Sequence, residues 1–254
     1  MKVKEKMKSK SIIKEFYENF TNKLIRDKIY PNPRHIKIKK YLEEIFSRTK
    51  FNSALEIGCG IGVISEFIAK NVNSVAGIDI SEENIRFAKK TVKNINFYCA
   101  DFFDFNTKEK FDLITLFDVL EHFPKSSHRD VFDQIDKLSS SNCFIAITIP
   151  DPHYLSFMRK HHPEELQIVD ESIYLEELNS IFSAFNFEII KYEKYGIDYD
   201  NQYRFYLLSR KKEKYILEKV INTDRNKLKS ILRKFANRIT IIRCKWKYGK
   251  FLKK

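Results

Sequence analysis

The chain has 254 residues, of which 43% are hydrophobic, and a formal net charge of +13. This length accommodates one large domain with appendages, and the hydrophobic content is sufficient for a packed core. The sequence has neither a signal-peptide pattern nor an apolar run of about 18 residues, which excludes a secreted or membrane-spanning class and predicts a cytoplasmic protein. The four cysteines lack metal-ligand spacing, and Cys99 and Cys143 fall in strands predicted to be buried.

Apolar residues at helical spacing predict that residues 1–50 form a helical N-terminal segment. It contains Tyr17 in the run FYENF and Arg34 after a turn-forming Pro-Asn-Pro run. The next segment, Ser53–Ile57, is short and apolar and predicts a buried strand. A glycine turn then leads into a predicted helix over residues 63–70.

Three of the chain's six glycines, Gly58, Gly60 and Gly62, lie in this turn. Glycine allows the backbone to approach a ligand closely, so the strand, turn and helix predict a cofactor cradle. A dinucleotide fingerprint has the spacing G-x-G-x-x-G, and its third glycine position is Val63 here. The observed spacing is G-x-G-x-G with the acidic Glu56 just upstream, and an acidic side chain suits a cationic cofactor better than a pyrophosphate.

Three further strands are predicted over residues 75–78, 95–99 and 111–116, and each is followed by polar residues. Asp79 and Ile80 follow the first of these strands. An acid in this position can accept hydrogen bonds from two ribose hydroxyls. Asp101 and Phe102 follow the next strand, and the string Phe-Asp-Val-Leu-Glu-His, residues 117–122, follows the last.

The remaining core continues the alternation of helices and strands. A helix is predicted over 131–138, a strand over 143–149, an insertion at about 150–172, a helix over 173–185 and strands over 187–192 and 202–208. This pattern predicts a doubly wound, seven-stranded and mostly parallel α/β sheet over residues 51–209. The last two strands have no helix between them and should be antiparallel.

The acidic residue with its glycines, followed by three strand-end motifs in order, resembles class I S-adenosylmethionine (SAM) methyltransferases of the small-molecule type. The Asp-Val-Leu-Glu-His string is similar to the corresponding segment of ubiquinone-biosynthesis methyltransferases. The runs HHPEELQIVDE and GIDYDNQYRFY partly resemble methyltransferases of surface-polysaccharide biosynthesis. The resemblance implies a Rossmann-like fold and SAM as cofactor, and we expect no bound metal.

The resemblance also implies roles for particular residues. An acid at Asp101 would contact the adenine, Tyr17 would belong to an aromatic lid, and Arg34 would pair with the SAM carboxylate. Core packing for Tyr17 and a surface position for Arg34 are open alternatives. The expected cofactor-binding residues are Tyr17, Arg34, Glu56, Gly58, Cys59, Gly60, Gly62, Asp79, Ile80, Asp101, Phe102 and Phe117.

A hydroxyl acceptor is helped by a general base, most often histidine. The candidates are His122, after the fourth strand, and His153 and His162, in the insertion. Each could instead be a capping or surface histidine, and the insertion histidines could bind a metal with Glu164 or Glu165. Tyrosines at 192, 195, 199, 203 and 206 could stack on sugar faces or simply pack in the core.

Residues 210–254 form a basic tail, with 17 Lys and Arg against three acidic residues, whereas residues 1–209 carry a net charge of −1. From Asp224 onward its apolar residues recur at helical spacing, which predicts an amphipathic helix. Such a helix could bind an anionic membrane surface, hold RNA phosphates, or pack its apolar stripe on protein.

The sequence therefore predicts a SAM-dependent methyltransferase acting on a small-molecule or glycan acceptor, most simply on oxygen, in surface-polysaccharide or lipid-linked glycan synthesis. It would be cytoplasmic or peripheral at the inner membrane face. The alternatives are an RNA methyltransferase that uses the basic tail, and a SAM-binding regulator or scaffold without catalysis. An RNA base substrate is less favoured because no N/D-P-P-Y/F motif follows the fourth strand.

Overall fold

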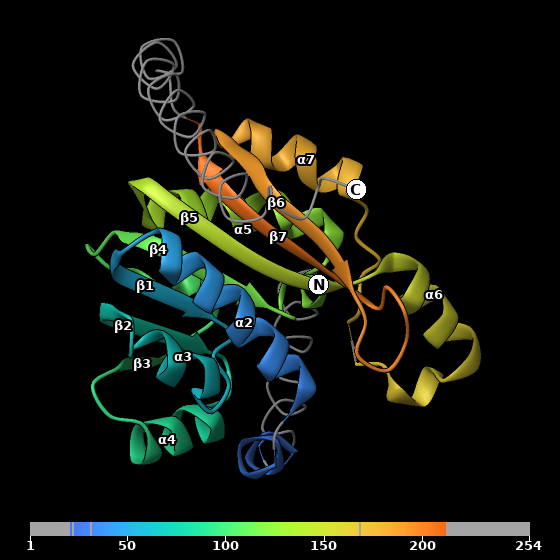
Figure 1. Ribbon diagram of the computed structural model, residues 1–254, viewed down its shortest axis with the longest axis horizontal. Coiled ribbons are helices and arrows are strands. Elements are labelled where there is room, and N and C mark those ends of the chain that lie inside the picture. The colour runs from blue at the N-terminus through green and yellow to red at the C-terminus, as the bar shows by residue number, and fades with distance from the viewer. Residues whose placement is uncertain (1–20, 22, 31, 168, 212–254) are drawn as a thin grey trace, which may run out of the picture. The chain divides into compact units, whose positions relative to one another are not determined.

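The computed structural model describes residues 21, 23–30, 32–167 and 169–211 (Figure 1). The predictions for Tyr17, for most of the N-terminal segment before residue 21 and for the tail helix fall outside these residues. The strands are β1 (Phe51–Ile57), β2 (Val72–Asp79), β3 (Asn96–Cys99), β4 (Phe111–Phe117), β5 (Ser139–Pro150), β6 (Phe187–Tyr195) and β7 (Tyr203–Arg210). The helices are α2 (Pro33–Arg48), α3 (Val63–Ile68), α4 (Glu82–Thr91), α5 (His128–Leu138), α6 (Pro152–His161) and α7 (Leu175–Ala184), with short 3-10 helices η1 (Phe102–Asp104), η2 (Leu120–His122), η3 (Lys125–Ser127) and η4 (Pro163–Glu165).

The strands form one sheet in the order β3-β2-β1-β4-β5-β7-β6. Strands β1 to β5 pair in parallel, and β7 is antiparallel to both β5 and β6. The predicted mostly parallel, doubly wound fold is confirmed. From β1 the chain moves outward to β3 and then returns to place β4 on the other side of β1. This reversal opens a crevice at the carboxyl ends of β1 and β4, where ligands bind in sheets of this kind.

Helices cover both faces of the sheet and create two hydrophobic cores. On one face, Tyr41 and Leu42 of α2 are buried with α3, and the Tyr41 ring stacks on Phe205 of β7 with centroids 3.9 Å apart. On the other face, Phe132 of α5 meets Phe182 of α7 with centroids 5.1 Å apart. The hydrophobic effect of burying these aromatic faces fixes the sheet between its helices.

The insertion predicted at about 150–172 contains helix α6, for which no helix was predicted. The start of α6 does have a sequence signal. Asp151 caps the helix by accepting a hydrogen bond from the backbone N–H of His153 at 2.9 Å, and Pro152 occupies its first turn. An N-cap aspartate before a proline is a standard helix start.

The prediction that Cys99 is buried is wrong, because Cys99 is exposed at the end of the edge strand β3, whereas Cys143 is buried. Only Phe97 is buried in β3. An edge strand is covered less than a central one, and periodicity in a four-residue strand cannot distinguish the two.

A buried ion pair joins the start of α6 to β7. Asp151 and Arg204 are 2% and 6% exposed, and the Asp151 Oδ2 accepts from the Arg204 Nε at 2.7 Å. Lys194 of β6 approaches the same oxygen at 3.2 Å. Burial raises the pKa of Asp151, but the hydrogen bonds from Arg204 and from the His153 backbone outweigh burial and lower it.

We expect Asp151→Ala to lower the free energy of unfolding by about 3–5 kcal/mol, because it leaves the Arg204 charge buried without its partner. The loss should persist at pH 4 and shrink only as the pH falls further, through the lowered pKa of Asp151, because the carboxylate stabilises the fold only while it is ionised. Urea unfolding at pH 7 and at about pH 2 to 3 measures both effects. Glu83→Ala, which breaks an exposed pair with Arg86, is the control and should change stability little. Equal losses of stability for the two variants would contradict the role given to the buried Asp151–Arg204 pair.

Candidate cofactor and acceptor site

The glycine turn between β1 and α3 leaves no room for side chains. Gly58 and Gly62 have positive φ angles of 69° and 78°. A Cβ on Gly58 would lie 2.4 Å from the Val119 side chain, and a Cβ on Gly62 would lie 2.7 Å from the Phe97 ring. Both conformation and space therefore restrict positions 58 and 62 to glycine. The backbones of Gly58 and Gly60 line the crevice, where they can contact a ligand.

Asp79, at the end of β2, ties this turn to the start of α4. Its Oδ2 accepts from the backbone N–H of Gly60 at 2.7 Å, and its Oδ1 accepts from the backbone N–H of Ser81 at 2.9 Å. The Asn84 side-chain amide donates to the same Oδ1 at 3.3 Å. Burial raises the pKa of Asp79, while these hydrogen bonds act against the rise.

Glu56, at the carboxyl end of β1, is 4% exposed. The Ser65 hydroxyl of α3 donates to its Oε2. Burial, together with the nearby charge of Asp79, raises the pKa of Glu56 to about 8. A pKa of about 8 favours the protonated form of Glu56 at neutral pH, and a cation placed beside it would favour its carboxylate form.

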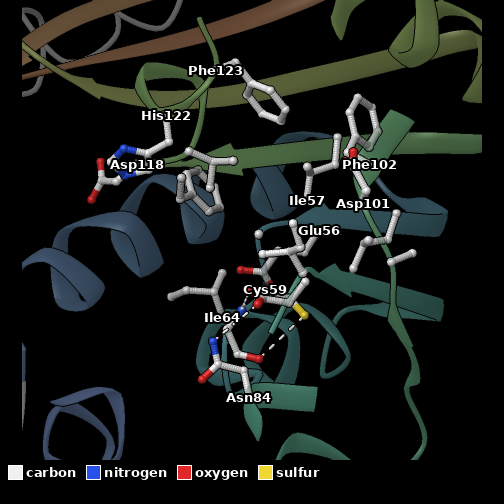
Figure 2. A pocket seen from close by; sticks show the side chains of 18 of the residues that line it. Glu56, Ile57, Cys59, Ile64, Asn84, Asp101, Phe102, Asp118, His122 and Phe123 are labelled. Carbon is white, nitrogen blue, oxygen red and sulfur yellow. Dashed lines mark hydrogen bonds between the residues drawn. The ribbon is translucent and has the colours of Figure 1, made fainter. Parts of the chain in front are cut away.

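A cavity of about 700 Å³ lies at the carboxyl ends of the parallel strands. Figure 2 shows Glu56, Cys59 and Asn84 together on one side of it, and Asp118 with His122 on another. Of the predicted site residues, the following line this cavity: Arg34, Glu56, Gly58, Cys59, Gly60, Asp79, Ile80, Asp101, Phe102, Phe117 and His122. Gly62 shapes the turn without lining the cavity. Asp101 also accepts a hydrogen bond from the Phe103 backbone at 3.0 Å and so caps η1.

Asp118, at the end of β4, was not among the predicted site residues. It is a non-glycine residue with a positive φ of 56°, a sparsely populated conformation of the kind that clusters at functional sites. The Thr148 hydroxyl donates to its Oδ1 at 2.8 Å, and Arg34 of α2 pairs with its Oδ2 at 3.2 Å. The rule that identified Asp79, an acid at a strand end, could have identified Asp118 as well.

His122 is the one predicted base that lines the cavity. Its Nδ1 lies 2.7 Å from the Val169 carbonyl oxygen and 3.2 Å from the Asp170 Oδ1. A carbonyl oxygen can only accept, so Nδ1 carries the proton. Burial lowers the pKa of His122, but the charges of Glu121 and Asp170 and the hydrogen bonds to Asp170 and Val169 raise it to about 9.

The other two predicted bases lie elsewhere. His153 and His162 do not line the cavity; His153 is in the first turn of α6, and His162 follows its end. The ligand atoms of His162, Glu164 and Glu165 lie within 4.8 Å of one another, on residues that are partly or fully exposed. These three belong to the group that the sequence analysis considered as metal ligands.

The predicted tyrosines divide into two groups. Tyr195, Tyr203 and Tyr206 are buried, as core packing requires, whereas Tyr192 and Tyr199 are 39% and 47% exposed. Other cavity residues escaped the sequence analysis, because they come from helices and connections whose positions the local pattern does not reveal: His35, Asn84, Phe103, Phe123, Asp130 and Gln167.

Residues 54–141 match a family model described as a methyltransferase domain. Over 91 residues the chain is 40% identical to a ubiquinone biosynthesis O-methyltransferase of Coxiella burnetii, covering 34% of this chain and 38% of that protein. Over 116 residues it is 25% identical to a malonyl-[acyl-carrier protein] O-methyltransferase of Haemophilus influenzae, covering 45% of each. The chain thus spans about two fifths of the length of the curated relatives it matches.

Solved structures are similar over a longer stretch. A magnesium protoporphyrin IX methyltransferase from Synechocystis with bound S-adenosylhomocysteine (SAH) has a TM-score of 0.64 at 15% identity, covering 80% of this chain and 100% of that one. The N-methyltransferase NodS from Bradyrhizobium japonicum in complex with SAH has a TM-score of 0.59 at 19% identity, covering 76% and 100%. These solved structures show the same fold as this chain. The family model, in addition, matches the sequence of residues 54–141. Residues 54–141 are therefore similar in sequence to a methyltransferase domain, and the described residues share the fold of class I methyltransferases.

Proposed function

We propose that this protein is a SAM-dependent methyltransferase acting on a small-molecule or glycan acceptor. The observation that carries the proposal is the crevice at the carboxyl ends of β1, β2 and β4, where Asp79 holds the glycine turn and carboxylates line a cavity of about 700 Å³. SAM, when bound, supplies an electrophilic methyl group on a sulfonium cation. The protein then has to bind the cofactor, orient the acceptor and exclude water.

The residues present fit such a cofactor. The Gly58 backbone lies where no side chain could, and the backbones of Gly58 and Gly60 both line the cavity, so the turn can contact the methionine part closely. Asp79 would take the ribose hydroxyls, and Asp101 with Phe102 would hold the adenine. Glu56 is placed near the amino group's expected position, and the Arg34 guanidinium, already oriented by Asp118, would pair with the carboxylate.

The charge of the lining supports a cationic ligand. Six carboxyl groups line the cavity: Glu56, Asp79, Asp101, Asp104, Asp118 and Asp130. Of the basic residues in the lining, Arg34 is paired with Asp118, and His122, with a pKa of about 9, is paired with Asp170. Burial together with the Arg34 charge lowers the pKa of His35 to about 4, so that His35 is neutral. A cavity with this excess of acids attracts a sulfonium cation and opposes an anionic dinucleotide.

For the base, we keep His122 as the candidate, because it lines the cavity. Since Nδ1 donates to Val169, the ring would accept a proton from an acceptor hydroxyl at Nε2. The pKa of His122 near 9 leaves only a fraction of the ring neutral at pH 7, so transfer to a hydroxyl should accelerate as the pH rises toward 9. His153 and His162 would need an acceptor that extends beyond the cavity.

A glycan acceptor is supported by aromatic rings on the surface. Phe157 of α6 and Tyr199 of the β6–β7 connection are 41% and 47% exposed, with ring centroids 5.8 Å apart. Tyr154 links Tyr199 to the buried Tyr203. Exposed aromatic faces of this kind can stack on sugar rings, which favours O-methylation in polysaccharide or lipid-linked glycan synthesis.

The basic tail bears on where the enzyme works. Its charge would bind an anionic membrane surface at the cytoplasmic side, and RNA is the second candidate partner. Among the described residues, no helix combines the length and apolarity needed to cross a bilayer.

Deleting residues 212–254 should release the protein from anionic vesicles if the membrane assignment is right, and from RNA if the alternative is right. SAM binding without transfer to any acceptor would instead favour the regulator or scaffold.

We expect Asp79→Ala to weaken SAM binding by roughly tenfold or more, because it removes charge-assisted hydrogen bonds and releases the Gly60 backbone. Calorimetric titration with SAM measures the effect. Glu83→Ala removes a nearby exposed acid and should leave the affinity unchanged. Unaltered SAM affinity in a folded Asp79→Ala protein would contradict the assignment, as would tight binding of NADH.

We also expect SAM affinity to rise with pH up to about 8, because Glu56 must lose its proton to face a cation. Calorimetry from pH 6 to pH 9 tests this in wild type and in Glu56→Gln, which keeps an acceptor for the Ser65 hydroxyl. The ligand's own titration is common to both proteins, so their difference isolates Glu56. The same slope in the two proteins would refute the role given to Glu56.

A further inference from the structure

Gln167 lines the cavity although it does not lie at the end of a strand. It follows η4 in the connection toward α7, whereas the residues that fit the cofactor come mainly from the ends of β1, β2 and β3. Asp118, His122 and Phe123, which follow β4, line the same cavity, and Gln167 and His122 both contact the Asp170 carboxylate. We place the methyl acceptor on this side, because the cofactor fit leaves it unused.

Hydrogen bonds hold the backbone of Gln167 in place. Its N–H donates to the Asp170 Oδ2 at 2.7 Å, and the other oxygen of the same carboxylate lies 3.2 Å from the Nδ1 of His122. The Glu171 N–H donates to the Glu121 carbonyl at 2.9 Å. Two consecutive residues of this connection are thus fastened to η2, and Gln167 is positioned through Asp170.

The side-chain carbonyl of Gln167 is in a different situation. Its Oε1 is buried and has no hydrogen-bond partner among the described residues. A buried polar atom without a partner costs free energy that a ligand recovers by pairing with it. A carbonyl oxygen accepts and cannot donate, so the ligand must bring an O–H or N–H group.

The surrounding charges narrow the class of ligand further. Asp118 and Asp130 line the cavity. Asp170 contacts the backbone of Gln167, and Glu121 contacts the backbone of Glu171. Burial raises the pKa of Glu121 while the His122 charge acts against the rise, and Arg34 and His122 contribute the positive charges. An anionic acceptor group would meet carboxylates and an acceptor-only amide oxygen, whereas a neutral hydroxyl or an amine would not.

We propose that Gln167 is a specificity-determining residue that selects acceptors bearing a hydroxyl or amino group, by accepting their hydrogen bond at Oε1, and disfavours carboxylate acceptors. The inference rests on the proposed function and narrows it, because it adds the class of group to be methylated. His122 and Asp170 have positioning roles, since they fix the connection that carries Gln167.

The test uses four probes that share one ring and differ in one group: phenol, anisole, benzylamine and benzoate. Each is titrated by ligand-detected NMR into the full chain saturated with SAH. We expect phenol and benzylamine to bind about fivefold more tightly than anisole and benzoate, as one hydrogen bond provides. Gln167→Met keeps the shape without the acceptor and should abolish the preference. Gln167→Glu keeps an acceptor and should retain phenol and strengthen benzylamine.

Gln134→Met is the matched control. The Gln134 amide donates to the Phe105 carbonyl and does not line the cavity, so the preference should survive there. Equal binding of phenol and anisole, benzoate binding as tight as phenol, no probe binding, or an unchanged preference in folded Gln167→Met would each overturn the inference. Failure to bind SAH would overturn the proposed function instead, and the probe preference would then be measured without it.

Discussion

The site depends on one carboxylate. Asp79 ends β2 and accepts hydrogen bonds from Gly60 in the turn after β1, from Ser81 at the start of α4 and from Asn84 within α4. It thereby joins two successive strand–helix connections, adding to the β1–β2 ladder and to the hydrogen bond from the Cys59 N–H to the Ile78 carbonyl. The glycine turn can then remain open, with its backbone facing the crevice, because Asp79 holds it from the side. Gly58 and Gly62 provide the conformation that makes this contact possible.

A second constraint is the concentration of acids at the carboxyl ends of the strands. Several of these groups are buried, and burial raises the pKa of both Glu56 and Glu121 to about 8. A cation in the cavity would favour the ionised form of these carboxyl groups. On the β4 side, Asp118 is paired with Arg34, and His122 is held by Asp170 and Val169. The cofactor side is left acidic, and the side assigned to the acceptor is held by ion pairs.

The sequence was sufficient for the seven-stranded, mostly parallel sheet and for most of the strand-end residues that line the cavity. The alternating apolar runs predict the parallel strands, and the acids at strand ends are local signals because each lies directly after its strand. Helix α6 could also have been predicted, from Asp151 and Pro152. The position of Gln167 could not be predicted, because it depends on tertiary contacts. These are the hydrogen bond from Gln167 to Asp170 and the contacts of the following residues with η2. The exposed edge position of Cys99 likewise depends on sheet order rather than on local pattern.

The most direct test of the central claim is a crystal structure of the full chain grown with SAH. The account predicts that the ribose hydroxyls lie within hydrogen-bond distance of the Asp79 carboxylate and that the amino-acid part lies against the Gly58–Gly60 backbone, with Glu56 on its amino side. SAH bound at another place, or in this cavity with its ribose away from Asp79, would contradict the account of how this fold holds its cofactor.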